Sequence, residues 1–178
     1  MMSENDQINL IKEHLKSYKD FPKQGVVFQD IFSVLQNPKI ANVLYDVLLN
    51  KAKSIKPPVE CIAGVDSRGF LFGSVLAREL EIPFIPIRKK GKLPGSTKSV
   101  HYKLEYKEDD LEMQEGVVRE GQKVLVVDDL LATGGSLSAA CELLSQAKAD
   151  VQCLVVIELS ELQGRKIINV PIHSLIVC

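Results

Sequence analysis

The sequence predicts an α/β fold with a mainly parallel central sheet and helices on both faces. Apolar residues at 124–127 indicate a buried strand, and apolar residues then recur at helical spacing from Leu137 to Ala147. A second buried strand at 61–65 is followed by a helical pattern that reaches Leu80. Because helices connect these strands, their carboxyl ends, and the turns that follow them, should meet at one edge of the sheet.

The N-terminal part of the chain is expected to be helical with an irregular interruption. Ser3 is expected to cap a helix over residues 3–19. Proline and glycine punctuate residues 21–31, which indicates an irregular segment with a short extended piece. Pro38 then suits the first position of a further helix that ends before Pro57.

The other strands follow from short apolar runs. Residues 84–87 form one such run, and Pro86 indicates that this strand is an irregular edge. Two later strands are predicted at 151–159 and 172–177.

Length and composition indicate one domain, residues 1–178, that binds neither nucleic acid nor a membrane. The chain has 178 residues, 46% of them hydrophobic, which is enough for an ordinary core. Its net charge of −1 gives no basic field to attract nucleic acid. No apolar run approaches the ~18 residues of a membrane span, and the polar residues after Ser3 argue against a secretory signal.

The four cysteines are expected to be buried, reduced thiols. They are Cys61, Cys141, Cys153 and Cys178. No two form a Cys-x-x-Cys pair, so buried thiols are favoured over a metal site or disulfides. Reduced cysteines predict a cytoplasmic location.

A small-residue loop after the strand at 124–127 is the first candidate site. Its residues are Ala132, Thr133, Gly134, Gly135 and Ser136. A loop that opens into a helix presents free backbone N–H groups, so it can bind a phosphate. Asp128 and Asp129 precede it, and carboxylates suit a ribose diol or a cation rather than a phosphate. The alternative is an acidic strand end that is merely solvated.

Two further anion-binding segments follow predicted strands. Asp66, Ser67 and Arg68 follow the strand at 61–65, and the guanidinium of Arg68 matches phosphate oxygens. An ordinary turn with a surface arginine is the alternative. The basic run at 88–92 includes Arg88, Lys89 and Lys92, and it suits pyrophosphate better than a merely solvated charge run.

Residues 21–31 and 91–110 are candidate coverings of this site. The first segment is rich in apolar residues, so it is either a packed connector or a hood that stacks a flat base on Phe28 and reads base edges through main-chain groups around Val27. The second alternates in polarity, which predicts a β-ribbon flap that excludes water. Glu105 is the acid on its alternate face, and on spacing alone it is a solvated carboxylate.

The run from Val124 to Ser136 resembles the phosphoribosyl pyrophosphate (PRPP) signature of type I phosphoribosyltransferases: a hydrophobic run, Asp-Asp, two hydrophobic residues and Ala-Thr-Gly-Gly-Ser. Neither a Walker loop nor a dinucleotide fingerprint occurs. The Phe-Pro-x-x-Gly-Val-x-Phe-x-Asp run at 21–30 and the Leu-Glu-Tyr run at 104–106 resemble the hood and flap of adenine phosphoribosyltransferases. The resemblance extends over roughly residues 15–178 in the same order. Gln29, where many relatives are expected to carry arginine, and Lys107, where glycine is frequent, depart from the pattern.

The resemblance implies formation of AMP and pyrophosphate from adenine and PRPP, with Mg²⁺ bound mainly through PRPP and no direct metal ligands from the protein. It implies a hood within about residues 1–35, a flexible flap at about 91–115, and proton transfer on the purine ring by Glu105, with Tyr106 beside it at the substrate. Asp128 and Asp129 would hold the ribose hydroxyls, residues 132–136 the 5′-phosphate, and residues 66–68 the pyrophosphate.

The resemblance also implies a homodimer in which Arg88 reaches toward the neighbouring site. A phosphoribosyltransferase for another base and a non-catalytic PRPP-sensing regulator remain the alternatives.

Overall fold

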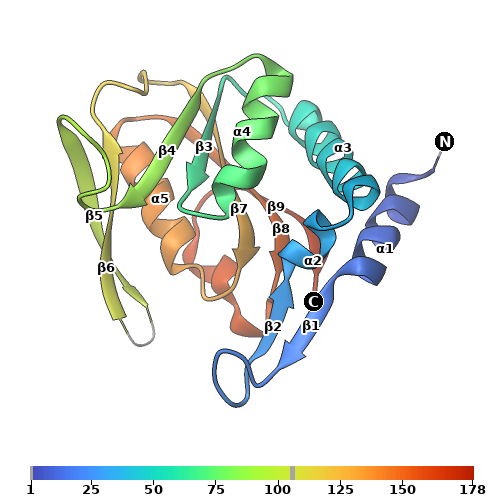
Figure 1. Ribbon diagram of the computed structural model, residues 1–178. Helices are drawn as coiled ribbons and strands as arrows, with labels where there is room; N and C mark the ends of the chain where they lie inside the picture. The colour runs from blue at the N-terminus through green and yellow to red at the C-terminus, as the bar shows by residue number, and fades with distance from the viewer. Residues whose placement is uncertain (1, 105–106) are drawn as a thin grey trace. The chain divides into compact units, whose positions relative to one another are not determined.

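The computed structural model describes residues 2–104 and 107–178 of the chain, with residues 103, 104, 107 and 108 described by their backbone alone. By its internal packing the chain divides into two compact units, Met1–Asn50 and Lys51–Cys178. Figure 1 shows both units with their elements labelled.

The first unit consists of short helices and a two-stranded hairpin. Its elements are α1 (Glu4–His14), β1 (Lys16–Lys19), β2 (Val27–Asp30), α2 (Ile31–Leu35) and most of α3 (Pro38–Ser54). The predicted cap of α1 is confirmed, because the Ser3 hydroxyl accepts the Asp6 N–H at 3.2 Å and the Asp6 carboxylate accepts the Ser3 N–H at 3.3 Å. The helix predicted to begin at Pro38 and end before Pro57 is also confirmed.

The predicted first helix is wrong beyond residue 14. Leu15 is extended, and β1 pairs antiparallel with β2, so that Lys16 lies opposite Asp30. The Lys16 N–H donates to the Ser33 hydroxyl at 2.9 Å, a bond that replaces the helical one. Tyr18 fitted the apolar stripe of the expected helix, yet it lies in β1 and is 48% exposed. The prediction failed because periodicity within one segment carries no information about strand pairing.

The second unit contains a seven-stranded sheet. Its strands are β3 (Cys61–Val65), β4 (Phe84–Lys89), β5 (Thr97–Leu104), β6 (Lys107–Gln114), β7 (Lys123–Leu131), β8 (Asp150–Glu158) and β9 (Ile172–Val177). They are arranged in the order β5-β6-β4-β3-β7-β8-β9. Strands β4, β3, β7, β8 and β9 are parallel to one another. Strands β5 and β6 form the antiparallel ribbon at one side. The predicted fold class is therefore confirmed.

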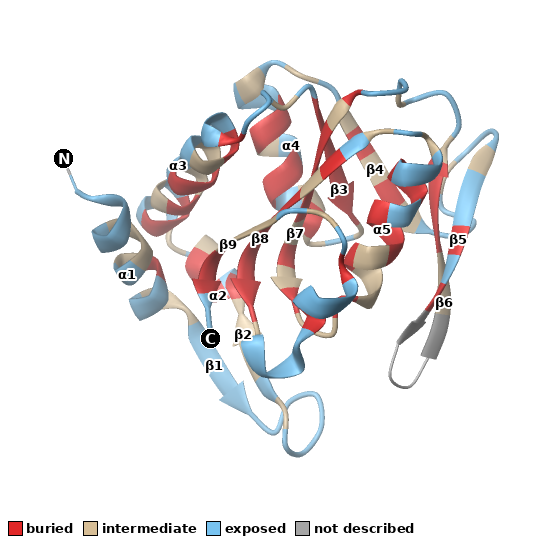
Figure 2. Cartoon of the chain, turned by 180° about the vertical axis from the view of Figure 1, so that it is seen from behind, coloured by how far each residue is buried: buried red, intermediate tan, exposed pale blue. Residues whose placement is uncertain are grey.

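Helices α4 (Gly69–Leu80) and α5 (Gly135–Gln146) cover opposite faces of this sheet (Figure 1). Residues of α5 pack with Ala63, Val126 and Cys153 of the central strands. Gly73 of α4 lies against Ile62, whose side chain points to the other face. Figure 2 shows buried residues in β3, β7 and β8, as expected for parallel strands that are covered on both sides.

Two strand predictions need correction. The strand expected to end before Asp128 continues to Leu131, because β8 pairs with it through Leu131 opposite Glu158. The strand that contains Pro86 is not an edge strand, since β4 lies between β6 and β3. Pro86 is tolerated there because β6 pairs with β4 only at Arg88 and Lys89, beyond the proline.

All four cysteines are free; three are buried, but Cys178 is exposed, which corrects its expected burial. Among the described residues, none of the helices combines the length and the apolar character that crossing a membrane requires.

Candidate functional site

The phosphate loop, residues 132–136, joins β7 to α5 at the carboxyl edge of the sheet. Gly134 caps α5 with φ +86° and contributes no side-chain hydrogen bond to the first turn of the helix. A Cβ at this position would also overlap the carbonyl oxygen of Gly164. The sequence therefore places glycine where a left-handed backbone and a close approach are both required, and backbone N–H groups remain available to an anion.

Asp128 and Asp129 are adjacent residues near the end of β7, just before the loop. Asp129 is buried and 4% exposed, whereas Asp128 is partly exposed. The Asp129 N–H donates to the Asp128 carboxylate at 2.9 Å. Burial, together with the charge of Asp129, raises the pKa of Asp128 well above its usual range. Burial also raises the pKa of Asp129, against the opposing effect of Arg68.

The turn at 66–68 meets the same edge, as the sequence predicts. Arg68 Nε lies 2.7 Å from Asp129 Oδ2, and a third of the Arg68 side chain, 33%, stays exposed. The first residue of α4, Gly69, lies so close to β7 that a Cβ would overlap the Val127 carbonyl oxygen. The peptide bond between Asp66 and Ser67 is cis. The turn at 66–68 and the start of α4 are thus joined to β7 by one ion pair and one close backbone approach.

The basic run is held within the chain by carboxylates. Arg88 Nε donates to Asp66 Oδ2 at 2.9 Å, which ties the run to the turn at 66–68. Lys89 lies 3.1 Å from Asp109, and Lys90 lies 3.1 Å from Asp110, both on β6. Phosphate groups would therefore meet cations that already have acidic neighbours.

Glu112 is a buried acid of the site that sequence reasoning missed. It is 2% exposed, and its Oε1 accepts the N–H groups of Lys92 and Leu93, both at 2.8 Å. Burial opposes its ionisation, but these bonds and one from the Gly91 backbone lower the pKa of Glu112. Its alternation with Leu111 and Met113 predicts a solvent-facing acid, so the pattern of the strand gives no signal of its burial.

The remaining predicted site residues are in the first unit or outside the described residues. Val27 and Phe28 belong to β2 in the first unit, where Phe28 packs edge-to-face on Phe21 with ring centroids 5.2 Å apart. Glu105 and Tyr106 lie outside the described residues. The antiparallel ribbon around them is confirmed by the pairing of β5 with β6, and Val100 and Tyr102 share its buried face.

Comparison with known proteins identifies the family. A model of the phosphoribosyl transferase domain matches residues 32–171. Adenine phosphoribosyltransferase from Drosophila pseudoobscura is 48% identical over 176 residues, which are 98% of this chain and 97% of that protein. The chain belongs to the adenine phosphoribosyltransferases. The predictions of family, fold class and enzyme class are thereby confirmed.

Solved structures of the family agree with this assignment. Adenine phosphoribosyltransferase from Saccharomyces cerevisiae, complexed with an imino-altritol bisphosphate and adenine, has a TM-score of 0.89 and 38% identity over 96% of this chain and 99% of that chain. The Trypanosoma brucei enzyme, in complex with AMP, pyrophosphate and ribose-5-phosphate, has a TM-score of 0.88 and 27% identity over 96% of this chain and 79% of its own.

Proposed function

We propose that this protein transfers the 5-phosphoribosyl group of PRPP to adenine, giving AMP and pyrophosphate, and that the reaction takes place at the edge formed by the turn at 66–68, Asp128, Asp129 and the phosphate loop. The observation that carries this proposal is the contact of Arg68 with Asp129 at 2.7 Å, because it sets a phosphate-binding cation beside a ribose-binding acid. The yeast and trypanosome structures support it, since adenine and AMP are bound to similar chains.

Each group has a role that follows from its charge. The phosphate loop would anchor the 5′-phosphate on backbone N–H groups and the hydroxyls of Thr133 and Ser136. Asp128 and Asp129 would accept hydrogen bonds from the 2′ and 3′ hydroxyls. Breaking the bond between C1′ and pyrophosphate develops positive charge on the ribose, which neighbouring carboxylates stabilise.

The leaving group needs the opposite charge. Arg68 and the turn formed by Asp66 and Ser67 would hold the pyrophosphate, with Arg88, Lys89 and Lys92 supplying further positive charge nearby. Arg88 already contacts Asp66, so the basic run and the turn can act on one ligand. The family resemblance implies base binding by Val27 and Phe28, and proton transfer on adenine by Glu105 with Tyr106 beside it.

The donor set suits a magnesium ion that PRPP itself carries. Within the described ranges, 2–104 and 107–178, no group of three or more His, Cys, Asp or Glu side chains is placed to hold a metal ion. Asp129 is already paired with Arg68, and Mg²⁺ is commonly bound by one or two carboxylates together with substrate phosphates. When bound, Mg²⁺ would offset the charge of the departing pyrophosphate.

The wider organisation is part of the proposal. Residues 1–178 would work as one domain, with a hood in about residues 1–35 and a flap at about 91–115. Four free cysteines support a cytoplasmic location. The family resemblance supports a homodimer.

Incubation with PRPP, Mg²⁺ and each nucleobase in turn tests the function. AMP and an equal amount of pyrophosphate should form with adenine, and hypoxanthine, xanthine and orotate should compete poorly. Preference for another base would reassign the substrate, and PRPP binding without pyrophosphate release would indicate a regulator.

A further inference from the structure

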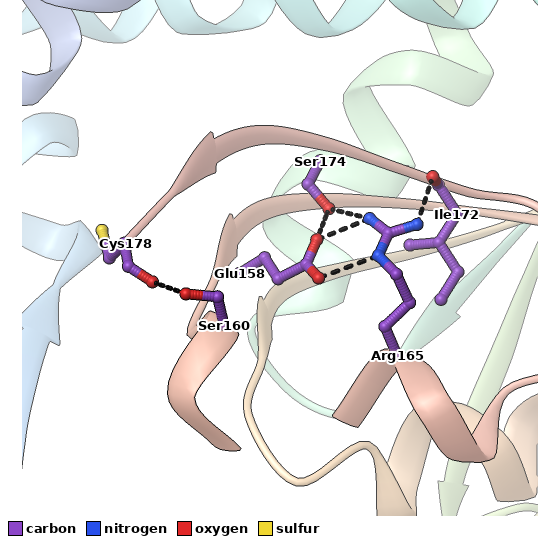
Figure 3. Close-up of polar contacts among 6 residues, drawn as sticks. All are labelled: Glu158, Ser160, Arg165, Ile172, Ser174 and Cys178. Atoms are coloured by element: carbon purple, nitrogen blue, oxygen red, sulfur yellow. Dashed lines mark hydrogen bonds and ion pairs between the residues drawn. The ribbon is translucent and has the colours of Figure 1, made fainter. Parts of the chain in front are cut away.

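A polar cluster of Glu158, Arg165 and Ser174 lies beside the phosphate loop. The Arg165 guanidinium forms a bidentate ion pair with Glu158. Its Nε donates to Oε1 at 2.9 Å, and an Nη donates to Oε2 at 2.5 Å. It also donates to the Ile172 carbonyl at 3.0 Å and to the Ser174 hydroxyl at 3.1 Å, while that hydroxyl donates to Glu158 (Figure 3). The ends of β8 and β9 are thereby tied to the short turn Gly164–Ile167.

Glu158 carries a charge that needs this partner. Glu158 is the last residue of β8 and is only 7% exposed. An ionised carboxylate at this position would cost free energy without a neighbouring cation. Arg165 lowers the pKa of Glu158, and Glu158 in turn raises the pKa of Arg165. The pair therefore stays ionised, and the Arg165 side chain is held in one position.

The turn Gly164–Ile167, which contains Arg165, lies directly against the phosphate loop. A Cβ at Gly164 would overlap the Ala132 carbonyl oxygen and would lie 2.7 Å from the Gly134 nitrogen. The Ser138 hydroxyl on the first turn of α5 reaches the Ile167 carbonyl at 3.5 Å. The backbone at Gly164 thus lies against the backbone of the phosphate loop, and one side-chain hydrogen bond joins the same turn to α5.

We propose that Glu158, Arg165 and Ser174 are positioning residues for the 5′-phosphate, because they hold Gly164 against residues 132–134 and so fix the direction of the loop N–H groups. The inference rests on the proposed function, in which this loop binds the phosphate. Small residues in a loop have little stiffness of their own, and binding of an oxyanion depends on donors that are already in place. The Arg165 guanidinium contacts Glu158, Ser174 and the Ile172 carbonyl, so its effect on the loop is exerted through Gly164.

Binding of AMP compared with adenosine, by titration calorimetry, separates phosphate binding from overall damage. Arg165→Met and Gly164→Ala should weaken AMP binding by roughly 10- to 100-fold and leave adenosine binding nearly unchanged. Ser174→Ala, the mildest change, should act in the same direction and serves where Arg165→Met does not fold. Arg165→Lys should restore part of the affinity lost in Arg165→Met. In steady state, KM for PRPP should rise more than kcat falls.

Glu120→Gln is the matched control, because it breaks an exposed ion pair with Lys148 at 3.0 Å in the same unit. It should bind AMP as the unaltered protein does. Equal weakening of AMP and adenosine, or unchanged AMP affinity in Gly164→Ala and Ser174→Ala, would overturn the positioning role. If the unaltered protein itself binds AMP no better than adenosine, the proposed function fails first.

Discussion

Asp128 and Asp129 show at the residue scale how a binding site opposes stability. They are adjacent, Asp129 is buried while Asp128 is partly exposed, and each has a raised pKa. Only Asp129 has the Arg68 guanidinium at 2.7 Å to offset its charge. A carboxylate whose pKa is raised by folding favours the folded state in its protonated form, so this contribution is lost as the pH rises through the raised pKa. Above its raised pKa, an ionised Asp128 therefore destabilises the ligand-free protein.

Asp128→Asn should raise the melting temperature of the ligand-free protein at neutral pH while it weakens PRPP binding. The gain should be on the order of 1 kcal/mol, or ~2–4 °C. Asp129→Asn is the matched change, and it should raise the melting temperature less, because Arg68 already offsets the charge of Asp129 and would lose its partner. Calorimetry with and without PRPP measures both effects. A lower melting temperature for Asp128→Asn would contradict the assignment.

The same raised pKa values predict how PRPP binding depends on pH. Hydroxyl groups need ionised carboxylates as acceptors, and these acids protonate at a higher pH than an ordinary aspartate, ~3.9. The KM for PRPP should therefore rise on acidification while the pH is still well above that value. In Asp128→Asn this rise should become smaller. A profile that stays flat down to the ordinary range would show that neither acid binds the ribose.

Glu105→Ala should lower kcat far more than PRPP affinity, if this residue transfers a proton on adenine. General acid–base groups are worth ~10²–10⁴-fold in rate. Steady-state kinetics with both substrates varied gives the two quantities separately, and Glu108→Ala on the same predicted ribbon is a suitable comparison. Equal losses in kcat and PRPP affinity would count against the role.

At the scale of elements, β6 anchors the loop that carries the basic run. Glu112 accepts N–H groups from Lys92 and Leu93 and lies 3.2 Å from the Thr97 hydroxyl, so one carboxylate organises the connection between β4 and β5. Its lowered pKa means that its stabilising effect is present above the ordinary glutamate pKa and is lost as the pH falls through the lowered value.

Glu112→Gln should reduce stability by about 1–3 kcal/mol at neutral pH, because a buried set of donors loses its charged acceptor. The difference from the unaltered protein should shrink below about pH 4.3. Pyrophosphate affinity should fall as the loop loosens. Glu115→Gln, an exposed change just beyond the end of β6, should leave both properties intact. Chemical denaturation across pH decides, and a difference that grows on acidification would be the opposite of the expected sign.

The entry of α4 depends on Gly69. Gly69→Ala should destabilise the protein by more than ~2 kcal/mol and weaken PRPP binding, because the new methyl group meets the Val127 carbonyl and pushes the turn at 66–68 away from Asp129. Gly73→Ala is the control in the same helix, where the nearest atom is a side-chain carbon of Phe84 at 3.0 Å that can yield. Thermal unfolding of the two variants should rank them in this order, and equal stabilities would refute the close-approach argument.

At the scale of the whole molecule, the second unit brings all the phosphate-directed segments to one edge of its sheet. Parallel pairing of β3 with both β4 and β7 makes this unavoidable, because each segment lies at or just beyond the carboxyl end of its strand. Assembly belongs to the same scale. Sedimentation of the active protein should give a dimer, and Arg88→Ala mixed with an otherwise inactive variant should test whether Arg88 serves a neighbouring site. Full activity of a dilute monomer would refute the homodimer.

The sequence alone predicted the family, the parallel sheet and three candidate anion-binding segments. These depend on local patterns: a buried strand, a glycine-rich turn and a helix follow one another within a few residues, so spacing is enough to show them.

Tertiary structure decided what distant residues do to one another. The strand at 16–19 formed because β2 lay beside it, and β7 ran through Asp128 and Asp129 because β8 continued to pair with it. Burial of Glu112 and the contact of Gly164 with the phosphate loop depend on segments far apart in the chain. No periodicity marks such pairs, since the free energy that fixes them comes from packing and charge compensation across the fold.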